Sequence, residues 1–203
     1  MAEQIKDGSG TASLARVDSN RRLHTQTVSI DEQGQANKKG NAYNLNTSLV
    51  TLTSAAESGV MYVKNNESRD LHVIAIIVIL GPSTGGSATD TTRVRFYKNP
   101  TTGTLISNAT DADINSNRNF KSGNTLNADV FKGATGNSIT DGNVHIESLV
   151  SPGNRVSFGI DEILSTGNSI AVSYEPPDDN TSMKTMTAVV CHLIEEANRD
   201  PNG

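Results

Sequence analysis

Two pairs of adjacent carboxylates are the residues whose types best fit acid–base chemistry. Asp161 and Glu162 form one pair, and Asp178 and Asp179 form the other. A glycosidase places two carboxylates about a scissile bond, one as the acid and the other as the base or nucleophile. Adjacent acidic residues in turn sequences are far more often solvated loop charges. The sequence therefore favours a non-catalytic role for both pairs.

Two glycine-rich or asparagine-rich segments resemble ligand-binding loops but fail in detail. DADINSN, at 111–117, repeats oxygen-bearing side chains as the start of a calcium loop does. The glycine and the bidentate glutamate that such a loop needs are replaced by Ser116 and Ser122. GPSTGGSATD, at 81–90, follows an apolar run but lacks the Gly-Lys-Ser/Thr ending of a phosphate loop. We expect both segments to be polar connections without a ligand.

Histidine and cysteine spacing offers no catalytic or metal motif. His24, His72, His145 and His192 are far apart, and none has a histidine or cysteine at ligand spacing. Cys191 adjoins His192, but adjacent strand residues point to opposite faces, which disfavours a Cys–His nucleophile pair. No Gly-x-Ser-x-Gly turn leads from a strand into a helical pattern, as serine hydrolysis would require. The sequence thus predicts no enzyme activity, no metal and no cofactor.

Charge and composition narrow the classes of partner. The 203 residues have a net charge of −5 and a pI of about 5.3, so no basic field attracts nucleic acid or an anionic membrane. The longest apolar run, VIAIIVIL at 73–80, is too short to span a bilayer. The single cysteine excludes an intramolecular disulfide and fits folding in a reducing cytoplasm. We therefore expect protein partners rather than nucleic acid or membrane.

From Tyr43 onward, short apolar runs alternate with turn sequences such as NPTTG and SPGN, with little helical periodicity. About eight to ten strands with these spacings predict an all-β sandwich or jelly roll over residues 43–196. The expected strands span 48–54, 59–65, 71–80, 93–99, 104–107, 125–133, 143–150, 154–160, 168–175 and 183–196.

Three of these segments allow finer predictions. VIAIIVIL is apolar on both faces, which predicts a central strand covered on both sides, in part by a neighbouring subunit. RVRFYKN alternates apolar and polar residues, as a half-exposed strand does. The last segment could begin a short helix, but the alternation from Met183 to Val190 favours a strand. Residues 197–203 are expected to fray.

The first 42 residues show neither the strand nor the helix pattern. Their few apolar residues cannot bury enough surface to offset a backbone-ordering cost of roughly 1–2 kcal/mol per residue. The segment is therefore either a disordered leader or an extended arm that becomes ordered against a partner. In the second interpretation, the partner-binding residues are the apolar anchors Leu14, Val17, Leu23, Val28 and Ile30, with Arg16, Arg21 and Arg22 beside them.

Two parts of the chain resemble virion structural proteins of tailed bacteriophages. A recurrent N-terminal motif of those proteins, Lys-Asp-Gly followed by Ala-x-Val-Asp-x-x-x-Arg-Leu, is present in the segment IKDGSGTASLARVDSNRRLHT. The segments NAYNLNTSLVTLTSAAESGVMYVKNNESRDLHV and FYKNPTTGTLISNATDADINSNRNF are similar to the bodies of the same proteins. The resemblance covers more than half of the chain and transfers no individual functional residue.

This resemblance implies a β-sandwich or jelly-roll subunit that forms a homotrimer and decorates, or cements, the outside of a capsid. The expected partners are further copies of the chain and the major capsid protein, and the expected location is the virion, after assembly in the host cytoplasm. The alternative is a tail, baseplate or head-fibre component that recognises a receptor or glycan. The sequence has no tryptophan, which disfavours glycan binding, because sugar sites usually stack an aromatic ring on the sugar.

Overall fold

A computed structural model of the chain describes residues 5–6, 12–13, 31–85 and 90–194. The chain divides into two compact units, residues 1–31 and residues 32–203. In the first unit, two short strands, β1 (Ile5–Lys6) and β2 (Ala12–Ser13), pair in antiparallel fashion. The tail predicted over 197–203 lies outside the described residues.

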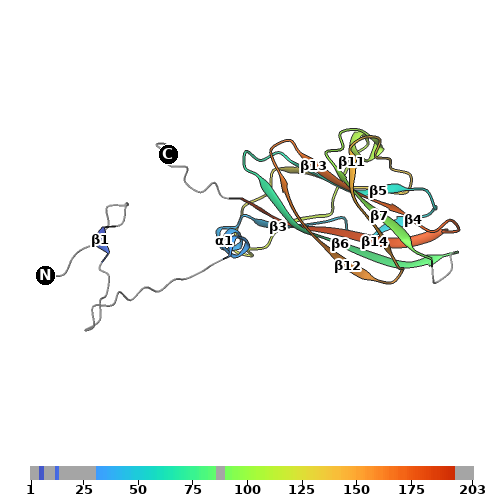
Figure 1. Ribbon diagram of the computed structural model, residues 1–203, viewed down its shortest axis with the longest axis horizontal. Helices are drawn as coiled ribbons and strands as arrows, with labels where there is room; N and C mark the ends of the chain where they lie inside the picture. The colour runs from blue at the N-terminus through green and yellow to red at the C-terminus, as the bar shows by residue number, and fades with distance from the viewer. Residues whose placement is uncertain (1–4, 7–11, 14–30, 86–89, 195–203) are drawn as a thin grey trace. The chain divides into compact units, whose positions relative to one another are not determined.

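The second unit is built mainly of strands (Figure 1). They are β3 (Ala42–Asn46), β4 (Val50–Leu52), β5 (Ser58–Asn65), β6 (Leu71–Thr84), β7 (Thr92–Lys98), β8 (Thr110–Asp111), β9 (Ile114–Asn117), β10 (Ala128–Lys132), β11 (Asn143–Val150), β12 (Arg155–Leu164), β13 (Ser169–Glu175) and β14 (Ser182–Leu193). Sheet I has the order β11-β7-β13-β5-β10-β8, and sheet II has the order β12-β6-β14-β3-β9, with β4 paired to β14. All pairings are antiparallel, which confirms the predicted all-β sandwich.

The core lies between the two sheets, where alternate residues of each strand meet. Val94 and Phe96 of β7 are fully buried, as the alternation of RVRFYKN predicts. Phe96 meets Phe158 of sheet II edge-to-face, with ring centroids 5.0 Å apart. The Tyr174 hydroxyl of sheet I lies 2.5 Å from the Thr187 hydroxyl of sheet II, which satisfies both groups inside the core.

The segment TLIS at 104–107 was predicted to be a strand, and this prediction is wrong. It forms the short helix α2 (Thr104–Ser107), whose backbone bonds run from Ser107 to Gly103 and from Asn108 to Thr104. Leu105 is buried against Tyr62 in a small second core. Four residues are too few for periodicity to distinguish a strand from a helical turn, so packing decides the conformation here.

Residues 32–39 form a second helix that the sequence pattern does not predict, α1 (Glu32–Lys39). The sequence EQGQANKK has no apolar face, and only Ala36 is buried. The helix begins with an acidic residue, ends with two lysines, and is closed by Gly40 at φ 74°, all of which favour a helix end at that point. Helix α1 packs against β3 and β14, and the two units divide after Asp31 rather than after residue 42.

Strand β6 contains VIAIIVIL and lies between β12 and β14, which confirms its interior position in a sheet. Its inward side chains, among them Val73, Ile76 and Val78, are fully buried. The prediction that both faces are covered is not met within the described residues, because the outward side chains of β6 are half-buried or exposed. β14 likewise confirms a strand, not a helix, at the end of the body.

Gly133 is a position where the fold requires the absence of a side chain. A Cβ built there would lie 1.8 Å from the Gly59 carbonyl oxygen, which is backbone and cannot move aside cheaply. We expect Gly133→Ala to destabilise the second unit by about 2–3 kcal/mol, lowering the melting temperature by roughly 5–10 °C. Differential scanning calorimetry measures this. Gly123→Ala, at a position with open space, is the matched control and should leave the melting temperature within about 2 °C.

Candidate interaction surface

The predicted carboxylate pairs do not converge on a common site. Asp161 Oδ1 lies 2.5 Å from His72 Nε2, whereas the Glu162 carboxylate lies 2.6 Å from His145 Nε2 on the opposite sheet. Adjacent strand residues point to opposite faces, which explains the separation. The arrangement offers no pair of carboxylates placed about one substrate bond.

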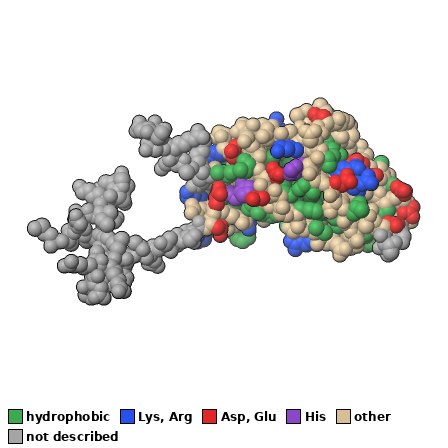
Figure 2. Space-filling view, viewed as in Figure 1, with side chains coloured by type: hydrophobic (Ala, Val, Ile, Leu, Met, Phe, Trp, Pro, Cys, Tyr) green, Lys and Arg blue, Asp and Glu red, His purple; other side chains and the backbone are tan. Residues whose placement is uncertain are grey.

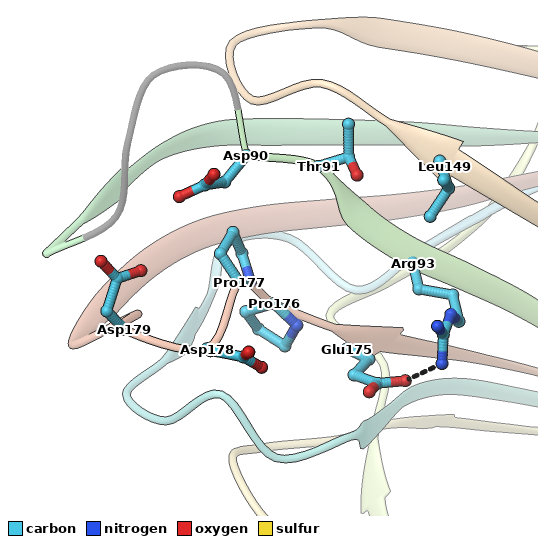
Figure 3. Close-up of a pocket in the computed structure, with 9 residues that line it drawn as sticks. All are labelled: Asp90, Thr91, Arg93, Leu149, Glu175, Pro176, Pro177, Asp178 and Asp179. Carbon is cyan, nitrogen blue, oxygen red and sulfur yellow. Dashed lines mark hydrogen bonds and ion pairs between the residues drawn. The ribbon is translucent and has the colours of Figure 1, made fainter.

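The second pair lines an open hollow of about 710 Å³ (Figure 3). Asp178 and Asp179 lie on the connection between β13 and β14, and Glu175 nearby pairs with Arg93 at 2.9 Å. The remaining lining residues are Asp90, Thr91, Leu149, Pro176 and Pro177. Acidic side chains around an open hollow indicate a solvated surface, in agreement with the sequence-based expectation.

The two loop-like motifs are also part of the sheets. DADINSN is split between β8 of sheet I and β9 of sheet II, so its oxygens do not encircle a common point. The Asp113 carboxylate pairs with Lys132 at 2.5 Å. The start of GPSTGGSATD continues strand β6, and the Ser83 hydroxyl donates to Asn180 Oδ1 at 2.6 Å; the next element is strand β7 rather than a helix.

The outward face of sheet II carries a row of apolar side chains, which we call the apolar row. By strand register, Ile79 lies opposite Met186, and Ile77 lies opposite Ala188. The row consists of Ala75, Ile77, Ile79, Met186, Ala188 and Val190. These residues are half-buried, and Ile79 is 36% exposed. Small or polar residues flank the row at Ser157 and Gly159 of β12 and at Asn44 and Asn46 of β3.

The outward face of sheet I is different in character. The Arg95 guanidinium contacts the carboxylates of Glu57, Glu147 and Glu175. A hydrogen bond from Arg95 holds the pKa of Glu147 below its usual range. Helix α2 packs on the same sheet around Tyr62. Sheet I therefore presents ion pairs, a covering helix and two exposed apolar side chains on its edge strand, Val144 and Leu149, whereas sheet II presents a continuous row of apolar side chains on two paired strands.

Strand pairing brings together two histidines that are far apart in the sequence. β6 and β14 pair in a register that places His72 opposite His192, with ring centroids 4.8 Å apart. Glu32 of α1 reaches the same place, with Oε1 3.7 Å from His192 Nε2. Figure 2 shows histidine beside acidic side chains on one face of the molecule. Burial, together with the nearby His72, lowers the pKa of His192.

Local histidine spacing misses this cluster because the two histidines come from strands separated by most of the body. The sequence could have predicted this cluster only if the pairing register of β6 against β14 were known. Cys191, in contrast, points into the core, where burial raises its thiol pKa to about 12. A thiol with a raised pKa forms little of the thiolate that acts as a nucleophile.

All eight arm residues that the sequence predicts to bind a partner lie outside the described residues. They are Leu14, Arg16, Val17, Arg21, Arg22, Leu23, Val28 and Ile30. Their role stays a prediction. Neither helix in the described part of the chain has the length and hydrophobicity needed to cross a membrane.

Comparison with solved structures gives weak similarities to viral particles. No protein-family model and no curated protein matches the chain. Among solved structures, T=1 particles derived from infectious bursal virus align over 100% of this chain and 47% of the other, with 12% identity and a TM-score of 0.17. An infectious bursal disease virus particle aligns over 100% and 47%, with 10% identity and a TM-score of 0.17.

The Gt strain of infectious bursal disease virus aligns over 80% of this chain and 42% of the other, with 12% identity and a TM-score of 0.16. The chain thus spans about half the length of these structures. Similarity this weak carries no information about function.

Proposed function

We propose that the protein is a non-enzymatic structural component of a tailed-phage virion, which binds the outside of the capsid and stabilises it. The observation that carries the proposal is the contrast between the two outward faces of the sandwich. Sheet II presents the apolar row at its surface, whereas the outward face of sheet I is dominated by α2 and a network of ion pairs, with exposed apolar side chains only on its edge strand β11 among the described residues. One apolar and one charged outer face suit a subunit that packs against protein on one side and meets solvent on the other.

The occupant we propose for the apolar row is a second copy of the chain, within the homotrimer implied by the resemblance to phage decoration proteins. Isoleucine, methionine and valine side chains gain about 25 cal/mol for each Å² removed from water. The six residues of the row span five positions along each of two strands, which covers roughly 17 Å by 10 Å, on the order of 200 Å². Specific interfaces bury about 800 Å² on each partner, so the row forms the centre of a contact and further residues complete it.

The contact with the capsid, in this proposal, comes from the N-terminal residues, which act as an arm on the capsid protein. Leu14, Val17, Leu23, Val28 and Ile30 supply apolar anchors, and three arginines supply hydrogen bonds. An arm tethered to a docked body binds at a high effective concentration. The contacts made by the arm must exceed the free energy spent on ordering it.

Quantitative mass spectrometry of purified virions tests this function. We expect the protein in hundreds of copies, in a fixed ratio to the major capsid protein. A few copies per particle would support the tail, baseplate or head-fibre alternative instead. Absence of the protein from purified virions would contradict a structural role of either kind.

A further inference from the structure

Four polar side chains from four separate elements converge at one end of sheet II. Glu32 comes from α1, His72 from β6, Asp161 from β12 and His192 from β14. One ligand atom each of Glu32, His72 and His192 lie within 4.8 Å of one another. Asp161 joins them through its 2.5 Å contact with His72 Nε2.

His192 is the unusual member of this group. Its side chain is 2% exposed, yet neither ring nitrogen has a hydrogen-bond partner among the described residues. A buried polar group without a partner costs about 1–3 kcal/mol, so folded proteins rarely leave one. The carboxylate oxygen Glu32 Oε1 lies 3.7 Å from Nε2, which is too far for a hydrogen bond.

We propose that Glu32, His72 and His192 bind a divalent transition-metal ion of the zinc class, with Asp161 orienting His72. Zinc binds histidine nitrogen and carboxylate oxygen at about 2.0–2.2 Å, which puts two tetrahedral ligand atoms roughly 3.4 Å apart. The 3.7 Å gap between His192 and Glu32 is close to that separation. A modest inward movement of the other ligand atoms would complete three protein ligands and leave a fourth position for water.

Asp161 has the role of a positioning residue. An ionised carboxylate only accepts hydrogen bonds, so His72 donates from Nε2 and keeps the lone pair of Nδ1 for the metal. Metal-binding histidines commonly donate their other ring nitrogen to a carboxylate in this way. Asp161 has φ 50° and lies where the register of β12 against β6 shifts. This bulge re-aims the carboxylate toward His72.

The exposure and charge of the cluster also suit a cation. His192 forms a buried floor, while Glu32 is 57% and Asp161 85% exposed at the rim, so an ion has access from solvent. Two carboxylates, Glu32 and Asp161, face the cluster, and the nearby guanidinium of Arg118 acts against cation binding. The bound ion would link α1 to β6 and β14, which already pair with each other at this point.

Zinc titration of the full-length, chelator-treated protein tests the proposal. Isothermal titration calorimetry should show one zinc ion per chain with micromolar or tighter affinity. At a hundredfold excess over Kd, the melting temperature should rise by roughly 5–10 °C, whereas Mg²⁺ should leave it unchanged. The Co²⁺ complex should show the intense visible absorption of tetrahedral coordination.

Variants with matched controls assign the ligands. His72→Gln and Glu32→Gln should each weaken zinc binding at least a hundredfold, and Asp161→Asn about tenfold. His145→Gln is the control, because His145 has a similar carboxylate partner outside the cluster and should bind zinc normally. Glu32→Gln changes an exposed residue, so a failure of His72→Gln to fold would leave the test intact. Absence of zinc binding, or equal losses in the His145 and His72 variants, would overturn the proposal.

Discussion

Replacing Ile77 with aspartate should convert the assembled protein into monomers. Ile77 lies at the centre of the apolar row, opposite Ala188, and is half-buried in the isolated subunit. If a second copy covers the row, the new carboxylate is buried without a partner, which costs several kcal/mol. A loss of about 3 kcal/mol weakens association roughly a hundredfold. Sedimentation velocity at micromolar concentration measures the change in mass directly.

The control for this variant is Leu149→Asp. Leu149 is 63% exposed on β11 of sheet I, on the charged side of the sandwich. The Leu149→Asp substitution should leave the oligomer intact, and circular dichroism should show folded strands in both variants. An Ile77→Asp protein with the mass of the wild type would show that the apolar row is not a subunit contact. Equal dissociation of both variants would likewise remove the special role of sheet II.

Deletion of residues 1–31 should abolish capsid binding while leaving the body folded. The second compact unit begins at Glu32, and among the described residues its core is formed from Tyr43 onward. The cut belongs at residue 31 because Ala36 of α1 is buried, and a longer deletion would also remove part of the sandwich. Losing a tethered arm removes its high effective concentration, so affinity for particles should fall at least a hundredfold. Co-sedimentation of the truncated and full-length proteins with particles that lack the protein measures this affinity.

A full-length variant with substitutions in the arm distinguishes the loss of arm side-chain contacts from the loss of the arm itself. Serine at Leu14, Val17, Leu23, Val28 and Ile30 keeps the length and charge of the segment and should bind about as poorly as the deletion. Glutamine at Arg16, Arg21 and Arg22 should give a smaller loss, because exposed charged contacts contribute less. A truncated protein that binds particles with full affinity would contradict the arm hypothesis.

The fold could be predicted from sequence where alternation and turn residues agree. RVRFYKN and the segment from Met183 to Val190 are examples, because one face of each strand is buried in the core. Helix α1 could not be predicted in this way, since it is polar on every side and is defined by its ends. TLIS became a helix because Leu105 packs on Tyr62, a contact that local sequence does not contain.

The candidate sites show the same limit more clearly. VIAIIVIL was predicted to be covered on both faces, in part by a neighbouring subunit. Its outward residues form the β6 half of the apolar row, and the contact with a neighbouring subunit stays a prediction. The sequence showed that this strand has two apolar faces, but only the register shows which residues of β14 continue the surface. The histidine cluster depends wholly on long-range pairing, because His72 and His192 stand at opposite ends of the body sequence.

A cryo-EM map of the virion tests the central claim most directly. We expect copies of the sandwich on the outside of the capsid, grouped around threefold axes. The outward face of β6 and β14 should be buried between copies, and the N-terminal residues should run along the capsid protein. A map that places the protein elsewhere in the particle, or that leaves the apolar row facing solvent, would contradict it.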